Sequence, residues 1–97
     1  MKKIEVITCF IYNKTASNTT GNLRSTGDRL FSYNTCIAQW VDGGIIVNRT
    51  KYSSTTSHHQ GMLERRLAGH IHMFPVFDVP KDTQYLNKEN YEGRESQ

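Results

Sequence analysis

Two strand-like runs joined by a glycine turn constrain the fold of this 97-residue chain more than any other feature. Residues 30–41 and 45–49 are rich in β-branched and aromatic side chains, which are enriched in strands. Between them lies Asp42-Gly43-Gly44, and glycine readily adopts the left-handed conformations that a tight turn requires. The sequence therefore predicts an antiparallel hairpin formed by these two runs.

A helix is predicted over residues 58–68, after a stretch rich in serine and threonine. Ser57 and Gln60 have the spacing of a capping box, in which each side chain binds the backbone amide of the other residue. Gly69 stands where a left-handed residue commonly ends a helix. The side expected to pack on the sheet carries His59, Met62, Leu63 and Leu67.

Runs near the two ends of the chain predict two more strands. Residues 4–12 are apolar on both alternating faces, which is typical of a central strand. Residues 70–77 also alternate, and Pro75 places this strand at a sheet edge because proline has no amide to donate. The polar residues 13–28 are expected to form a long loop.

Together these elements predict an α+β domain, with an antiparallel sheet of about four strands and one main helix packed on a face. The domain is expected to span residues 1–80. Residues 81–97 are expected to form a polar, partly disordered tail with a docked turn near Tyr85.

Composition limits the classes of function. A chain of 97 residues forms one small domain, which favours a shallow surface site over a deep cofactor cavity. The formal net charge of +3 biases it towards anionic partners. We expect a cytoplasmic protein without a membrane partner, because no signal peptide is evident and no apolar run approaches the roughly 20 residues that span a bilayer. Cys9 and Cys36 are expected to be buried thiols in neighbouring strands.

Candidate catalytic and metal-binding residues have little support. His70 and His72 would lie on one face of a strand, and a third ligand from the helix would complete a metal site. No carboxylate or cysteine stands at a supporting spacing, so no metal and no other cofactor is expected. A serine near the helix start, or Cys36 beside His72, lacks the glycine-flanked elbow and orienting carboxylate of known nucleophiles. We therefore expect no catalytic residue, and a small enzyme remains a third alternative.

The stretch that leads into the predicted helix has the best physical case for a binding site. Arg49, Lys51 and Tyr52 precede hydroxyl residues and a helix N-terminus, where free amides and the helix dipole favour an anion. A phosphate of a nucleic acid backbone would suit such a site. The predicted binding residues are Arg49, Lys51, Tyr52, His58, Arg65, Arg66, Arg24 and Arg29. The alternative is that the arginines form a solvated rim and that Tyr33 and Trp40, which could stack on bases, belong to the core.

Two segments resemble a known family: Ser32-Tyr33-Asn34-Thr35-Cys36-Ile37-Ala38 and Lys51-Tyr52-Ser53-Ser54-Thr55-Thr56-Ser57-His58-His59-Gln60. The family comprises small phage and mobile-element proteins with a Ser-Tyr-x-Thr-x-Ile-Ala strand, a hairpin and a Tyr-Ser-x-Thr-Thr-Ser-x-His-Gln helix start. The resemblance covers about residues 30–68 and implies a phage origin and a shared scaffold, without an activity. His58 departs from the lysine expected at its position, which weakens a phosphate-binding interpretation of the helix start.

The expected function is that of a small, non-enzymatic, phage-type binding protein in the host cytoplasm. It would engage nucleic acid through its basic, hydroxyl-rich helix entrance. The alternative is a phage inhibitor of a host protein, for example of a defence nuclease in the manner of anti-CRISPR proteins. A homo-oligomer that associates through a sheet edge or an apolar patch belongs to the same alternative class.

Overall fold

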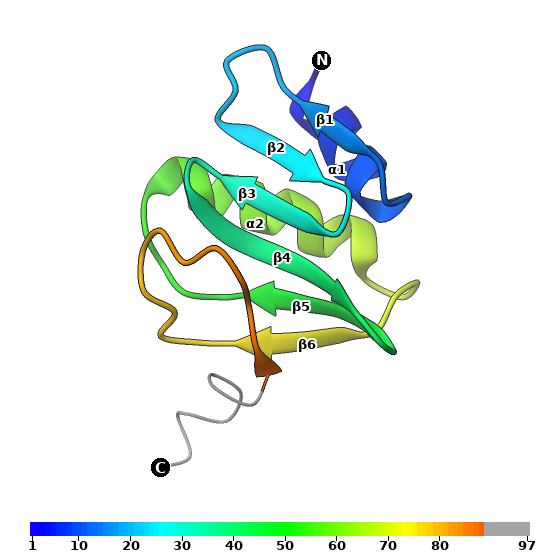
Figure 1. Cartoon of the computed structure of the whole chain (residues 1–97), viewed down its shortest axis with the longest axis vertical. Helices are drawn as coiled ribbons and strands as arrows, with labels where there is room; N and C mark the ends of the chain where they lie inside the picture. Colours follow the sequence, from blue (N-terminus) through cyan, green and yellow to red (C-terminus); the bar gives the residue numbers. More distant parts are fainter. Residues whose placement is uncertain (89–97) are drawn as a thin grey trace.

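The computed structural model describes residues 1–88 and contains a six-stranded sheet and two helices (Figure 1). In chain order the elements are α1 (Lys3–Ile11), β1 (Thr15–Ser17), β2 (Leu23–Thr26), β3 (Arg29–Ser32), β4 (Thr35–Val41), β5 (Gly44–Asn48), α2 (Ser54–Leu67) and β6 (Met73–Val76). The strands follow one another across the sheet, antiparallel from β1 to β5 and parallel between β5 and β6. The predicted α+β class is confirmed. The prediction of about four antiparallel strands and one main helix is partly wrong, because the sheet has six strands with one parallel pair and is accompanied by two helices.

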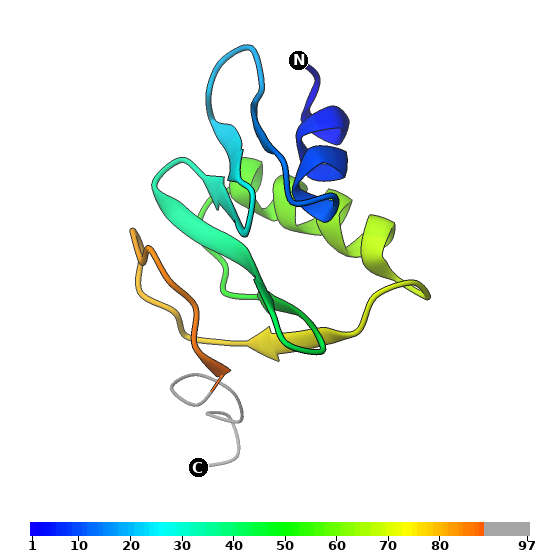
Figure 2. The ribbon, with the colours of Figure 1, turned by 45° about the vertical axis from the view of Figure 1, so that its right-hand side comes forward.

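Three layers make up the molecule. Both helices cover the back of the sheet, and residues 79–88, which we call the C-terminal strap, cross its front (Figure 1, Figure 2). The back core joins both helices to the sheet through Val6, Ile7, Phe10, Leu23, Leu30, Ile37, Ala38, Ile45, Val47, Leu63 and Leu67. The smaller front core joins the strap to the sheet through Phe31, Cys36, Ile46, Val76, Val79 and Leu86.

Residues 4–12, predicted to be a strand, instead form helix α1 and the residue that follows it. Val6, Ile7 and Phe10 are fully buried, and their spacing places them on one face of a helix. At the N-terminus the amide of Lys2 donates to the Glu5 carboxylate at 2.7 Å. A short apolar run fits both periodicities, so packing against the sheet decides between them. Cys9 therefore lies on a helix and is half-buried, whereas Cys36 is buried in β4; both thiols are free.

The predicted loop over residues 13–28 contains β1 and β2. Asn18 organises the turn between them, because its Oδ1 accepts from the Leu23 amide at 3.0 Å and its Nδ2 donates to Asn22 Oδ1 at 2.7 Å. Both strands are short and polar, and β1 is an edge strand, so their hydrophobic pattern was too weak to recognise.

The run over residues 30–41 is not one strand, because a turn at Tyr33 and Asn34 separates β3 from β4. Tyr33 has a left-handed backbone with a φ of 55°. The hairpin that follows is confirmed: Val41 pairs with Gly44, and Gly43 takes a φ of 89° in the turn.

Helix α2 begins four residues earlier than predicted. Its N-cap is Ser53, whose Oγ accepts from the Thr56 amide at 3.2 Å. Ser57 is therefore an exposed residue inside the helix, and the Gln60 side chain donates to the carbonyl oxygens of Asn48 and Thr50. The side that packs on the sheet is confirmed, since His59, Leu63 and Leu67 are buried and Met62 is half-buried. Gly69 follows the helix with a φ of 77°, as predicted.

The edge position predicted for Pro75 is confirmed, because it lies in β6 at one side of the sheet. In the strap Leu86 is buried, and residues 89–97, the rest of the tail predicted over residues 81–97, lie outside the described part of the chain. Neither of the helices in residues 1–88 has the length and apolar character needed to cross a membrane.

Candidate functional site

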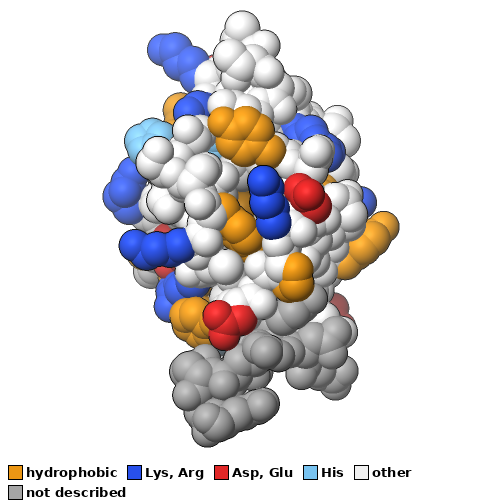
Figure 3. All heavy atoms as spheres, turned by 90° about the vertical axis from the view of Figure 1, so that its left-hand side faces the viewer, with side chains coloured by type: hydrophobic (Ala, Val, Ile, Leu, Met, Phe, Trp, Pro, Cys, Tyr) orange, Lys and Arg blue, Asp and Glu red, His pale blue; other side chains and the backbone are white. Residues whose placement is uncertain are grey.

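A shallow pocket of about 730 Å³ opens at the N-terminus of α2. Three segments form its walls: the β3–β4 turn, the connection from β5 into the first turn of α2, and the start of the strap. These segments meet at the left-hand end of the molecule in Figure 1, the end that faces the viewer in Figure 3. We call this the α2 pocket; its lining is Ser32, Tyr33, Asn34, Thr35, Lys51, Tyr52, Ser53, Thr55, Thr56, Lys81 and Asp82. The volume is in the range of sites that hold small molecules.

A chain of hydroxyl groups forms the floor of the pocket. Ser53 Oγ lies 3.2 Å from Thr56 Oγ1, and Thr56 Oγ1 lies 2.9 Å from Ser32 Oγ. Ser32 Oγ lies 2.8 Å from Nδ1 of His59, which is the buried end of the chain. These contacts hold the end of β3 against the first two turns of α2 and give the pocket a rigid polar floor.

His59 is fully buried, and among residues 1–88 its Nε2 has no hydrogen-bond partner. Burial lowers the pKa of the imidazole to about 4, with smaller contributions from Lys3 and His58. The ring is therefore neutral near pH 7. A general base works best with a pKa near the operating pH, and Ser32 is itself only 1% exposed, so this pair is better suited to support than to nucleophilic catalysis.

The rim of the pocket carries a net positive charge. Lys51 and Lys81 are both exposed and face one acidic lining residue, Asp82. The amides of Ser54 and Thr55, at the first positions of α2, have no acceptor within the helix. Figure 3 shows this end of the molecule as mostly uncharged polar surface with scattered Lys and Arg side chains.

Two tyrosines shape the opening. Tyr33 is 51% exposed on the β3–β4 turn, where its left-handed backbone is an uncommon conformation for an aromatic residue. Tyr52 is half-buried, and its hydroxyl donates to the carbonyl oxygen of Val79 and accepts from Asn48 Nδ2 at 3.0 Å. Tyr52 thus ties the strap to β5, whereas Tyr33 presents its ring at the rim.

Of the eight predicted binding residues, only Lys51 and Tyr52 line the α2 pocket. Arg49 lies next to this region but donates from Nε and Nη2 to the Glu64 carboxylate, at 3.2 and 2.9 Å. His58 is exposed on α2 and is not a lining residue.

The four other arginines lie elsewhere. Arg65 and Arg66 are in the last turn of α2, and Arg66 Nη2 donates to Thr8 of α1 at 3.0 Å. Arg24 and Arg29 lie on the front of the sheet, where both guanidinium groups contact the Phe31 ring. The structure therefore distributes the predicted residues over three surfaces.

Sequence reasoning did not assign Lys81, Asp82 and Ser32 to a site. Lys81 and Asp82 follow Pro80 in a polar segment, and nothing in that composition indicates that the chain folds back to α2. Ser32 lies 27 residues from His59, and no local motif links them. Tyr33 was recognised only as a side chain for stacking or for the core.

His70 and His72 do not gather ligands around them. His72 is exposed, and its ring makes an edge contact with Phe74 at 4.5 Å between ring centres. Across residues 1–88 the structure contains no group of three His, Cys, Asp or Glu residues placed to hold a metal ion. Burial raises the pKa of the Cys36 thiol to about 12, so this cysteine is protonated at physiological pH and unsuited to nucleophilic attack.

The fold and site define a small α+β protein with an open pocket, lined mainly by polar residues, at a helix entrance. The chain belongs to a family of unknown function (DUF8033), whose model matches residues 7–71. The matched region contains the second half of α1, all of α2 and β1 to β5, but ends before β6 and the strap. No curated protein and no solved structure matches the chain.

Proposed function

We propose that this is a non-enzymatic, phage-type binding protein whose α2 pocket takes a phosphate group of a nucleic acid backbone. The observation that carries the proposal is the convergence of Lys51 and Lys81, from distant parts of the chain, on a helix N-terminus whose first amides have no acceptor within the helix. Cations, amides and hydroxyl donors are the groups that bind phosphate oxygens.

The rest of the pocket also suits a phosphate. Thr55 adds a hydroxyl donor at the wall, and the open shape leaves room for the chain on either side of one phosphate. Asp82 reduces the positive charge without cancelling the two lysines. Arg49 contributes less than predicted because Glu64 neutralises it.

The direct test is binding of a fluorescent oligonucleotide of about 20 nucleotides, measured by anisotropy between about 50 and 200 mM salt. We expect the affinity to fall with salt, and the double variant K51A/K81A to lower the slope by roughly one to two, because each lost phosphate contact removes about 0.7 to 0.9. Lys14→Ala is the control for the single variants Lys51→Ala and Lys81→Ala, since it removes one positive charge from an exposed lysine outside the pocket.

Two outcomes would reject the proposal. One is an affinity that does not change with salt. The other is a double variant that binds with the affinity and salt slope of the unmodified protein. In either case a host protein partner would become the better interpretation, and nuclease-treated lysate would be the material in which to seek it.

A further inference from the structure

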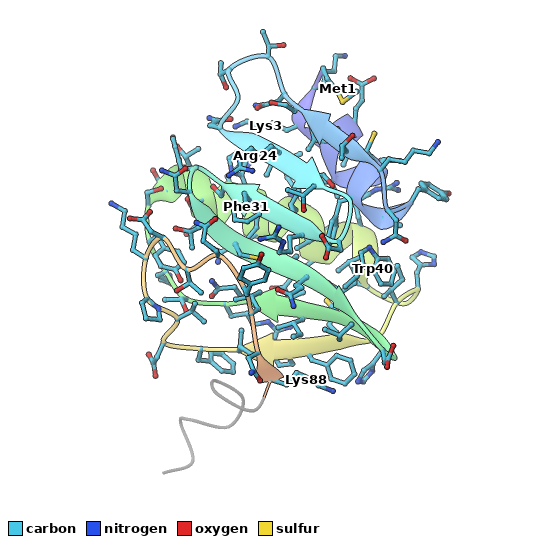
Figure 4. The ribbon with its side chains drawn as sticks, in the orientation of Figure 1. Met1, Lys3, Arg24, Phe31, Trp40 and Lys88 are labelled. Carbon is cyan, nitrogen blue, oxygen red and sulfur yellow. The ribbon has the colours of Figure 1, made fainter. Side chains whose placement is uncertain are left out.

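A series of alternating arginine and aromatic side chains crosses the front of the sheet beside the α2 pocket (Figure 4). Cζ of Arg24 in β2 lies 4.3 Å from the centre of the Phe31 ring, and Cζ of Arg29 lies 5.2 Å from the same centre. Cζ of Arg29 also lies 4.2 Å from the centre of the Tyr85 ring, which the strap supplies. The contacts therefore run in the order Arg24, Phe31, Arg29, Tyr85.

Exposure along this series is uneven. Phe31 is 1% exposed and the Arg29 side chain 19%, so the middle of the series is structural. Tyr85 is 66% exposed, which leaves much of its ring open to a further stacking partner. Arg24 is half-buried at the other end. The two ends are thus the parts that a ligand can reach.

The exposed tyrosine is held by its neighbours. Arg29 Nη1 donates to the carbonyl oxygen of Gln84 at 3.1 Å, and the amide of Leu86 donates to Gln39 Oε1 at 2.8 Å. Leu86 itself is buried in the front core. A ring whose flanking backbone is held, and which contacts Arg29, loses little conformational entropy when a ligand stacks on it.

Both ends of the series lie next to residues of the α2 pocket. Leu23, the residue before Arg24, pairs with Ser32 of the pocket floor. In the strap, Gln84 Nε2 donates to the carbonyl oxygen of Asn34, another pocket residue, at 2.8 Å. A strand with a phosphate in the pocket can therefore extend onto these arginine and tyrosine side chains.

We propose that the Arg24–Tyr85 series stacks on the unpaired bases of a single-stranded nucleic acid, so that the ligand is a single strand and not a duplex. This inference rests on the proposed phosphate site. An aromatic ring or a guanidinium plane accepts any base face, but the faces of paired bases are covered by their neighbours in a duplex. The charges of Arg24 and Arg29 complement the phosphates of such a strand.

The test compares one sequence as a single strand, as a duplex and as an abasic strand with the same phosphates. Single strands of DNA and RNA are both titrated, which also identifies the sugar. We expect the single strand to bind about tenfold more tightly than the duplex at equal salt. Tyr85→Ala should weaken single-strand binding about tenfold, the size of one lost base stack, and should leave abasic binding unchanged.

Matched variants separate stacking from folding and from charge. Tyr12→Ala removes a tyrosine that is equally exposed, at 68%, but lies after α1, and it should have no effect. Tyr85→Phe keeps the aromatic ring and should bind the single strand as tightly as the unmodified protein does. Arg24→Lys keeps the charge but loses the planar guanidinium group. It should therefore weaken binding of the single strand and leave binding of the abasic strand unchanged.

The results distinguish failure of this inference from failure of the phosphate site. Equal binding of duplex and single strand, or full single-strand affinity in Tyr85→Ala, overturns the inference. The proposed phosphate site remains supported if K51A/K81A weakens binding of the abasic strand. If K51A/K81A leaves abasic binding unchanged, both proposals are overturned.

Discussion

Ser32 Oγ lies 2.8 Å from Nδ1 of His59 and joins the end of β3 to the middle of the buried face of α2. The two residues are 27 positions apart and almost fully buried, at 1% and 0% exposure. Their contact fixes the floor of the α2 pocket, because Ser32 also bonds to Thr56 in the first turn of the helix. The shape of the candidate site therefore depends on a neutral imidazole beneath it.

Acid should destabilise the fold through His59. Its pKa is about 4 in the fold, against 6.5 for an ordinary histidine, so the unfolded chain binds a proton first as the pH falls. The stability contributed by the neutral ring is complete above pH 6.5 and is lost at about 1.4 kcal/mol per pH unit as the pH falls from 6.5 towards 4. Urea unfolding at pH 7 and pH 4.5 measures this loss.

The control for that experiment is the adjacent histidine. His59→Gln should flatten the pH dependence of stability, whatever its effect at pH 7, whereas His58→Gln should change the dependence only slightly, because His58 makes only a small contribution to the lowered pKa of His59. A pH dependence that persists in full in His59→Gln would assign the effect to other groups.

Ser53→Ala should destabilise the start of α2. Its Oγ is the acceptor for the Thr56 amide, and loss of such an N-cap costs about 1 kcal/mol. Ser57→Ala should instead be neutral or slightly stabilising, because Ser57 is exposed within the helix and alanine has the higher helix propensity. Thermal unfolding of both variants tests this. The reverse order of stability would support the capping box predicted from the sequence.

Gly44 should be the glycine least tolerant of a side chain. A Cβ at this position would overlap the carbonyl oxygen of His72, where the chain approaches β6, and neither backbone segment can move freely. We expect Gly44→Ala to cost about 3 kcal/mol in the free energy of unfolding. Gly21→Ala is the control: its φ is 78° but nothing lies within 4 Å, so only the backbone cost of about 1 kcal/mol applies. Similar losses for both variants would exclude the steric explanation.

Arg49 should matter less for binding than Lys51, although both were predicted contacts. Its guanidinium is paired with Glu64, and the partners are 39% and 28% exposed. Arg49→Ala should therefore cost at most about 1 kcal/mol in stability and change oligonucleotide affinity much less than Lys51→Ala. Anisotropy measurements on both single variants decide this. A larger loss in Arg49→Ala would mean that the pair opens when the ligand binds.

The predicted residues that line the α2 pocket are ones that lie close together along the chain. Lys51 and Tyr52 precede the helix directly, so the same local stretch that ends β5 also forms a pocket wall. Ser32 lies 19 residues before Lys51, and Lys81 lies 29 residues after Tyr52. No short-range sequence pattern indicates that these distant segments lie together in the fold.

The sequence alone determined the β4–β5 hairpin, the packing side of α2 and the end of that helix at Gly69. Each depends on local properties: the conformations open to glycine and the spacing of apolar residues on one face. Tertiary structure decided that the run beginning at Ile4 is a helix and that Ser32 meets His59. An isolated apolar run has two acceptable periodicities, and only burial of Val6, Ile7 and Phe10 against the sheet selects one. The partners of buried polar groups are likewise set by which distant segments pack together.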